Sequence, residues 1–285
     1  MDPSRVYALD VECVASGTTH TARTVAQIGI VVRVRHFPTS ARGEAFGKGR
    51  KRTLCIQFNQ YVKPDVPVVS CLTELTGCVE KEQRHRGRSA LRGAIGRAAL
   101  ELPRRTLFPV SLAPSRAAPR PCPRRVTMEH LEKYGVPFDV AMQSVRRFLP
   151  KDAVLVGHGV GHDVEWLGLV EGVDFASLVD LAGLTRAWNP KFNSYTVFSQ
   201  DHIVKNLLGW NLATTHDAVG DAIKSLNVYW RYKQLEADPE GRKAADELLL
   251  NAPRTPGFSV LHPTYEGVCM GNRRKCTCGD VFILG

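Results

Sequence analysis

The sequence predicts an α/β protein in which helices flank a mixed sheet. Strand-like runs rich in β-branched residues lie within the first 64 residues, and from residue 126 onward short apolar runs alternate with segments of helical periodicity. Early strands followed by such alternation are typical of a sheet with antiparallel and parallel neighbours, covered by helices.

The first strand carries two acidic residues on one face. Successive strand side chains point to opposite faces, so Asp10 and Glu12 stand side by side with Ala8. Two buried carboxylates this close either share a proton or share a cation, whereas on an edge strand both could be solvated. The three early strands are expected at residues 5–14, 24–32 and 53–64.

Helices dominate the second half of the sequence. Helical spacing predicts two short helices over residues 126–150, and the last long helix has an apolar stripe at positions 219, 222, 223, 226 and 230. The order of expected elements is a strand (153–159), a helix (162–170), a strand or helix (173–185), a helix ended by Gly209 (199–210), a long helix (215–237) and a further helix within 238–260.

Two basic segments interrupt this pattern. Residues 33–52 carry a net charge of +6, and residues 78–125, which include six prolines, carry a net charge of +9. The net charge of the whole chain is +10. We predict that both are disordered inserts in one domain at residues 1–237, followed by an extension at 238–285. The total charge suggests a polyanionic partner. Because that charge lies in the inserts, the rest of the chain is slightly acidic.

Cysteine usage and the N-terminal sequence bear on location. Eight irregularly spaced cysteines and an N-terminus without an apolar leader predict free thiols in an intracellular protein, nuclear or cytoplasmic. No apolar run is long enough for a membrane span. In the tail, His262, Cys269, Cys276 and Cys278 are conceivable zinc ligands. We do not expect zinc there, because C-x-C differs from C-x₂-C and no second ligand pair has a familiar spacing.

Four carboxylates and one histidine form the candidate site. Asp163 opens a helix after the fourth strand, and His216 and Asp221 flank the start of the last long helix; Asp10 and Glu12 complete the set. Such a set suits two Mg²⁺ or Mn²⁺ ions about 3.5–4 Å apart for in-line phosphoryl chemistry. A neutral histidine beside them can take a proton from the attacking water.

The order of these motifs resembles a known family. "LDVECV", then "LVGHGVGHD", then "HDAVGD" resemble the three motifs of the DEDDh 3′→5′ exonucleases, and look most like the RNA exonuclease branch. The resemblance covers roughly residues 5–32, 53–77 and 126–235. It implies an RNase H-like fold with a five-stranded mixed sheet. The implied metal ligands are Asp10, Glu12, Asp163 and Asp221, and the implied general base is His216.

The resemblance also implies a substrate. It would be single-stranded nucleic acid with a free 3′ end, RNA rather than DNA, cleaved to nucleoside 5′-monophosphates. Cys13 and Val14, just after Glu12, would contact the terminal nucleotide. Two alternatives stay open: a nucleic-acid-binding module with low activity, and a DNA-directed exonuclease. The sequence identifies no protein partner.

Overall fold

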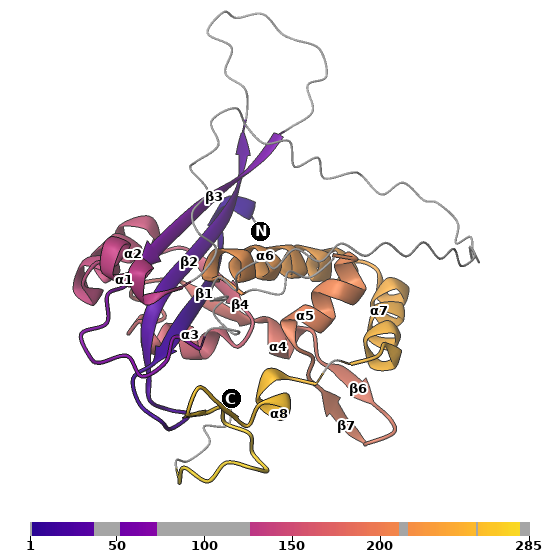
Figure 1. The fold of residues 1–285 in the computed structure, drawn as a ribbon. Helices are drawn as coiled ribbons and strands as arrows, with labels where there is room; N and C mark the ends of the chain where they lie inside the picture. Colours follow the sequence, from indigo (N-terminus) through magenta and orange to yellow (C-terminus); the bar gives the residue numbers. More distant parts are fainter. Residues whose placement is uncertain (1, 37–51, 73–125, 211–215, 255, 280–285) are drawn as a thin grey trace, which may run out of the picture. The chain divides into compact units, whose positions relative to one another are not determined.

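A five-stranded sheet in the order β3-β2-β1-β4-β5 is the centre of the fold (Figure 1). A computed structural model describes residues 2–36, 52–72, 126–210, 216–254 and 256–279, which all belong to one unit of the chain. Strands β1 to β3 are antiparallel neighbours, and β4 and β5 continue the sheet parallel to β1. The strands are β1 (Val6–Ala15), β2 (Arg23–His36), β3 (Arg52–Tyr61), β4 (Val154–Gly157) and β5 (Ser177–Asp180). The predicted fold class is therefore confirmed.

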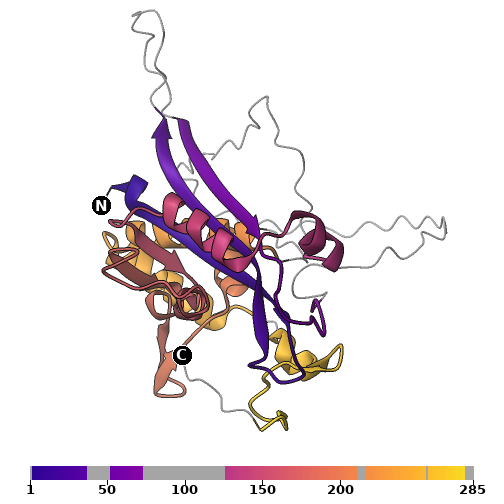
Figure 2. The same cartoon turned by 90° about the vertical axis from the view of Figure 1, so that its left-hand side faces the viewer.

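Helices cover both faces of this sheet. Helix α6 (Ala218–Leu235) packs on the face that carries Ala8 of β1. Helices α2 (Phe138–Phe148) and α3 (Val160–Trp166) pack on the opposite face, around Leu9. Figures 1 and 2 show α2 on the far side of the sheet from α6. Neighbouring residues of β1 thus face different helical layers, which confirms the predicted alternation.

A glycine brings α6 close to the acidic face of β1. In the β1–β2 register Asp10 pairs with Gly29, and Glu12 pairs with Gln27. A side-chain carbon on Gly29 would overlap the backbone of Ala218, the first residue of α6. The missing side chain therefore lets α6 begin directly over β2, beside the two acidic residues of β1.

Several shorter elements complete the described residues. Residues 173–185, for which strand and helix were both open, contain one of each, and the β6–β7 hairpin was not expected. Gly209 has φ of +66° and ends its helical segment as predicted.

The shorter elements are η1 (Pro3–Arg5), α1 (Met128–Tyr134), α4 (Leu181–Leu184), β6 (Ala187–Asn189), β7 (Ser194–Thr196), α5 (Gln200–Ile203), the π-helical turn η2 (Val204–Leu208), α7 (Pro239–Asn251), α8 (Phe258–Leu261), β8 (Thr264–Tyr265) and β9 (Val268–Cys269).

The first basic segment is partly strand. The prediction of a disordered insert at 33–52 is wrong at both ends, because β2 continues to His36 and β3 begins at Arg52. The "VVRVR" run keeps the period of two that a strand requires, although it is charged. Residues 37–51 and the insert predicted at 78–125 lie outside the described residues. Among the helices that are described, none has the length and apolar character that a bilayer span requires.

Candidate active site

Three carboxylates from opposite ends of the sequence meet over the sheet. Asp10 and Glu12 project from β1 on the face covered by α6, and Asp221 lies in the first turn of that helix. One oxygen from each lies within 4.8 Å of the others. Asp221 is buried, while Asp10 and Glu12 are partly exposed. This spacing lets one cation contact all three.

Asp163 approaches the same group from another direction. It lies in the first turn of α3, directly after β4, which is the parallel neighbour of β1. It is buried and close enough to raise the pKa of Asp10 by repulsion. Burial, and secondly the charge of Asp180, raise the pKa of Asp163 itself to about 8. Asp163 therefore lies beside the group of three, and the structure brings all four predicted carboxylates to one region.

The electrostatics of this group fit a cation. Burial, and then repulsion from Asp163, Glu12 and Asp221, raise the pKa of Asp10 well above its ordinary value. Burial, and then repulsion from Asp221, raise the pKa of Glu12 to about 8. Carboxyl groups with such pKa values hold protons at neutral pH unless a cation replaces them. The residues present therefore match the donor set and the charge that Mg²⁺ or Mn²⁺ requires.

His216 is hydrogen-bonded to one of these acids. Its Nδ1 lies 2.9 Å from Oδ2 of Asp221, and its Nε2 lies 3.7 Å from Oδ2 of Asp201 on α5. The hydrogen bond with Asp221 raises the pKa of His216 and outweighs the lowering by burial. The structure thus places the predicted histidine at the edge of the acidic group.

A lysine that the sequence analysis missed also joins the site. Lys224 Nζ lies 2.6 Å from Oδ1 of Asp221 and 3.0 Å from Oδ1 of Asp201. Burial would raise the pKa of Asp221, but His216 and Lys224 together hold it below its ordinary value. The spacing of three residues between Asp221 and Lys224 on a helix is a signal for this pair. Asp201 lies on another helix, so no spacing in the sequence indicates its contact with Lys224.

Two nearby acids have capping roles. Asp217 is the N-cap of α6 and accepts a hydrogen bond of 2.9 Å from the backbone N–H of Gly220. Asp180 ends β5 and accepts from the backbone N–H groups of Ala182 and Gly159. In each of these two residues Oδ1 satisfies backbone donors at the start of a helix, which gives both acids a structural role.

The two residues predicted to touch the substrate lie at the end of β1. A β-bulge between Glu12 and Cys13 shifts the register there. Cys13 is partly exposed, whereas the side chain of Val14 is fully buried in a small apolar cluster. Only the main chain of Val14 is therefore available for the expected contact.

Comparisons with known proteins extend this description. No family model matches the sequence, and no curated protein matches it. The pseudoubiquitin hydrolase–RNA exonuclease module of Saccharomyces cerevisiae Pan2, in complex with AAUUAA RNA, matches with 17% identity and a TM-score of 0.52 over 89% of this chain and 34% of that chain. The catalytic unit of Neurospora crassa Pan2, a protease and nuclease domain, matches with 16% identity and a TM-score of 0.49 over 88% and 30%.

The matching structures are much longer than this chain. The chain spans about a third of the Saccharomyces cerevisiae module and 30% of the Neurospora crassa unit. At this level of identity the likeness shows the fold alone. That fold is a mixed five-stranded sheet flanked by helices, consistent with an RNase H-like exonuclease fold.

Proposed function

We propose that the protein is a metal-dependent 3′→5′ exonuclease of the DEDDh type that cleaves single-stranded nucleic acid, preferably RNA, to nucleoside 5′-monophosphates. The main support is the convergence of Asp10, Glu12 and Asp221 within 4.8 Å, although they come from distant parts of the sequence. The Saccharomyces cerevisiae Pan2 structure that shares the fold is described as a pseudoubiquitin hydrolase–RNA exonuclease module in complex with an RNA oligonucleotide.

Asp10, Glu12, Asp163 and Asp221 would hold Mg²⁺ or Mn²⁺. Divalent ions at such a site activate a water molecule and stabilise the leaving 3′ oxygen in an in-line displacement. Burial, followed by repulsion from Asp221 for Glu12 and from Asp180 for Asp163, raises the pKa of each of these carboxyl groups to about 8. Neutralising that repulsion gives the site its affinity for divalent cations.

His216 would take the proton from the attacking water. In the neutral tautomer whose Nδ1–H donates to Asp221, Nε2 keeps its lone pair and can accept that proton. The carboxylate of Asp201, 3.7 Å from Nε2, would then stabilise the imidazolium. Asp221 would thus orient the base as well as bind the cation.

Lys224 would act as a competing cation. In this structure its ammonium group lies against Asp221 and Asp201 at once. A divalent ion bound by Asp221 would repel it, and Lys224 could keep its 3.0 Å contact with Asp201 when the contact with Asp221 is lost. The affinity of the site for metal would therefore include the work of displacing Lys224.

The substrate would approach along the end of β1. The partly exposed side chain of Cys13 and the main chain of Val14 follow the acidic pair and would contact the terminal nucleotide. Preference for a free 3′ end would follow if this end of the strand admits one nucleotide beyond the scissile bond. Discrimination of RNA from DNA requires a contact to the 2′-hydroxyl.

The test is digestion of a single-stranded RNA labelled at either end, with Mg²⁺ and with EDTA. Release of mononucleotides from the 3′ end only with Mg²⁺, and its loss in Asp10→Asn and His216→Ala, would support the proposal. Asp65→Asn is the matched control, because Asp65 is an exposed acid outside the site. Undiminished activity in Asp10→Asn would refute the site assignment.

One observation favours the alternative of a binding module. If Lys224 permanently occupies Asp221, the site would bind nucleic acid without cleaving it. Wild-type protein would then bind single-stranded RNA with the same affinity in Mg²⁺ and in EDTA and would release no mononucleotide. A parallel DNA substrate separates the third possibility, a DNA-directed exonuclease.

A further inference from the structure

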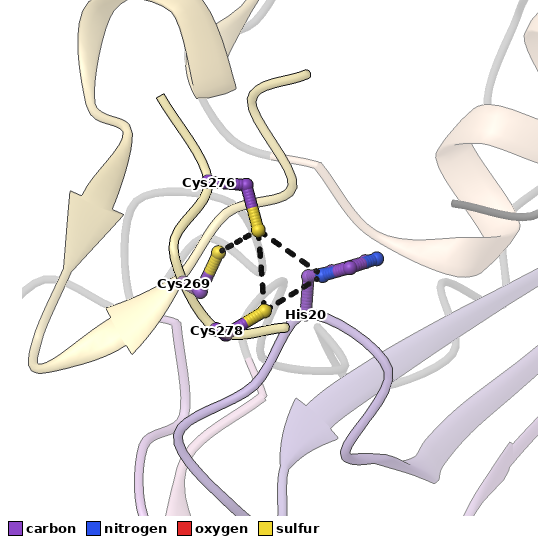
Figure 3. A group of neighbouring side chains, drawn as sticks. All are labelled: His20, Cys269, Cys276 and Cys278. Carbon is purple, nitrogen blue, oxygen red and sulfur yellow. Dashed lines mark hydrogen bonds between the residues drawn. The ribbon is translucent and has the colours of Figure 1, made fainter. Parts of the chain in front are cut away.

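A second group of ligand-type side chains lies away from the carboxylates. His20, in the turn between β1 and β2, points toward three cysteines of the C-terminal segment (Figure 3). One ligand atom from each of His20, Cys269, Cys276 and Cys278 lies within 4.8 Å of all the others. The sequence analysis considered these cysteines with His262, whereas the structure supplies His20, which lies far from them in the sequence.

Four of the six distances between ligand atoms are within about 0.6 Å of those around a single tetrahedral ion, and the other two are below 4.8 Å. Cys276 Sγ lies 3.4 Å from Cys269 Sγ and 3.2 Å from Cys278 Sγ, and His20 Nδ1 lies 3.2 Å from Cys278 Sγ and 3.8 Å from Cys276 Sγ. Zn–S bonds of about 2.3 Å and Zn–N bonds of about 2.0 Å place tetrahedral ligands about 3.5–3.8 Å apart. A disulfide between two of these cysteines would need a sulfur separation of about 2.05 Å and would leave the third thiol and the imidazole unused.

The backbone positions Cys269 independently of its side chain. Glu266 and Gly267 have φ of +49° and +77°, as a tight two-residue turn requires, and they connect β8 to β9. The N–H of Cys269 donates to the carbonyl of Thr18 at 2.8 Å, and Arg23 Nη2 donates to the carbonyl of Cys269 at 3.0 Å. The hairpin is thus hydrogen-bonded to the same turn that carries His20.

A buried asparagine positions the next cysteine. Asn272 accepts the backbone N–H of Cys276 on its carbonyl at 2.8 Å and the N–H of Arg274 on its side-chain oxygen at 3.0 Å. Its side-chain amide donates to the carbonyl of Ser259 at 2.8 Å. This network closes the loop between the two halves of the cysteine set, so both halves are oriented by contacts that do not involve sulfur.

We propose that His20, Cys269, Cys276 and Cys278 form a structural zinc site that joins the C-terminal segment to the β1–β2 turn. Three thiolates and one imidazole are a ligand set that zinc prefers, and four protein ligands leave no position open for substrate. Binding would release three thiol protons, since thiolates are the ligands. The expectation that the tail holds no zinc is therefore replaced by this proposal, which does not depend on the proposed nuclease activity.

The first experiment is metal analysis of the purified full-length protein. We expect about one zinc ion per chain. Cys276→Ser, Cys278→Ser and His20→Ala should each lose most of it. Cys71→Ser, a partly buried cysteine outside the group, should retain it, and so should Asp10→Asn, which shows that the carboxylates are not the zinc ligands. Zinc lost in Asp10→Asn and retained in Cys276→Ser would overturn the proposal.

The second experiment uses wild-type protein, in case the ligand variants do not fold. Zinc would be removed with a chelator and replaced by Co²⁺, and thiol alkylation would be mapped by mass spectrometry before and after. We expect the absorption of tetrahedral cobalt with thiolate ligands, and protection of Cys269, Cys276 and Cys278 only in the metal-loaded protein. An octahedral cobalt spectrum, equal alkylation in both states, or a disulfide between two of these cysteines in the protein as purified would refute the site.

Discussion

Two groups of candidate metal ligands adjoin the β1–β2 hairpin and differ in almost every chemical respect. The first consists of oxygen donors on β1 and α6, and two of its members, Asp10 and Glu12, are partly exposed. The second consists of three sulfur donors and one nitrogen donor at the turn that follows β1. Oxygen ligands with exposed positions suit an exchangeable ion that meets substrate, and a complete sulfur–nitrogen set suits a permanent ion.

The difference between the two groups bears on whether a bound ion could exchange. In the carboxylate group a partly buried lysine, Lys224, already lies against Asp221, so a divalent ion would have to compete with it. In the cysteine group three ligands fall within ten residues of the C-terminal segment, and the fourth, His20, comes from the other end of the sequence. A permanent ion between such segments would act as a crosslink, whereas an exchangeable ion at the carboxylates would take part in the proposed reaction.

The largest expected effect is that of Asp10→Asn, which should change the property of one group and leave that of the other unchanged. We expect nuclease activity to fall by more than the roughly 10–100-fold that loss of an outer-shell partner of a metal site causes, because a direct ligand is removed. Zinc content should not change. Activity is measured on end-labelled RNA, with Asp65→Asn as the control; parallel loss of zinc and activity would mean that the two groups are one functional unit.

Cys276→Ser should have the reverse effect. Loss of a structural metal should lower the melting temperature by about 10 °C. Activity per folded molecule should stay within about threefold of wild type, because the carboxylates are untouched. Scanning calorimetry and single-turnover digestion at low temperature measure the two quantities. A normal melting temperature in Cys276→Ser, together with a normal zinc content, would contradict the role of the cysteine group.

Lys224→Met tests whether the carboxylate site is tuned by a competing cation. Removing the ammonium group should lower the Mg²⁺ concentration for half-maximal activity by roughly 5–10-fold, since less charge opposes the metal. Lys233→Met is the matched control, because Lys233 pairs with Glu236 further along the same helix. An unchanged or higher Mg²⁺ requirement in Lys224→Met would show that the lysine does not compete.

The smallest expected effect is on the pH dependence of stability without metal. Glu12 has a pKa of about 8 in the folded protein and 4.5 as its ordinary value, so the folded state binds more protons across this interval. Its contribution to stability is complete below about pH 4.5 and is lost as the pH rises toward 8. The melting temperature should therefore fall as the pH rises over this range, and the fall should become smaller with saturating Mg²⁺.

Glu12→Gln provides the comparison for that slope. The difference between wild type and Glu12→Gln cancels the opposite trend expected of the cysteine group, whose thiolates bind metal more tightly as the pH rises. A wild-type slope that Glu12→Gln does not reduce would assign the pH dependence to other groups.

Local patterns predicted much of the sheet and the candidate site. The alternation in β1 placed Asp10 and Glu12 on one face, and the structure has them there, beside Asp221. Such features depend on periods of two or 3.6 residues, which a sequence displays directly.

Features that depend on distant contacts were not predicted. Nothing near His20 in the sequence indicates a metal ligand, and long-range contacts, including the hydrogen bonds of β9 to the β1–β2 turn, bring it to the cysteines. Asp201 reaches Lys224 from another helix. The strand character of Arg33 to His36 was missed because charge was given more weight than alternation.

The absent side chain at Gly29 has a consequence for the whole site. Gly29→Ala would insert a single methyl group between β2 and the backbone that begins α6. That methyl group would shift the start of α6, and Asp221 and His216 with it, away from Asp10 without removing any functional group. The alignment of the proposed catalytic groups would therefore not tolerate one additional carbon atom at residue 29, although this residue itself has no side chain.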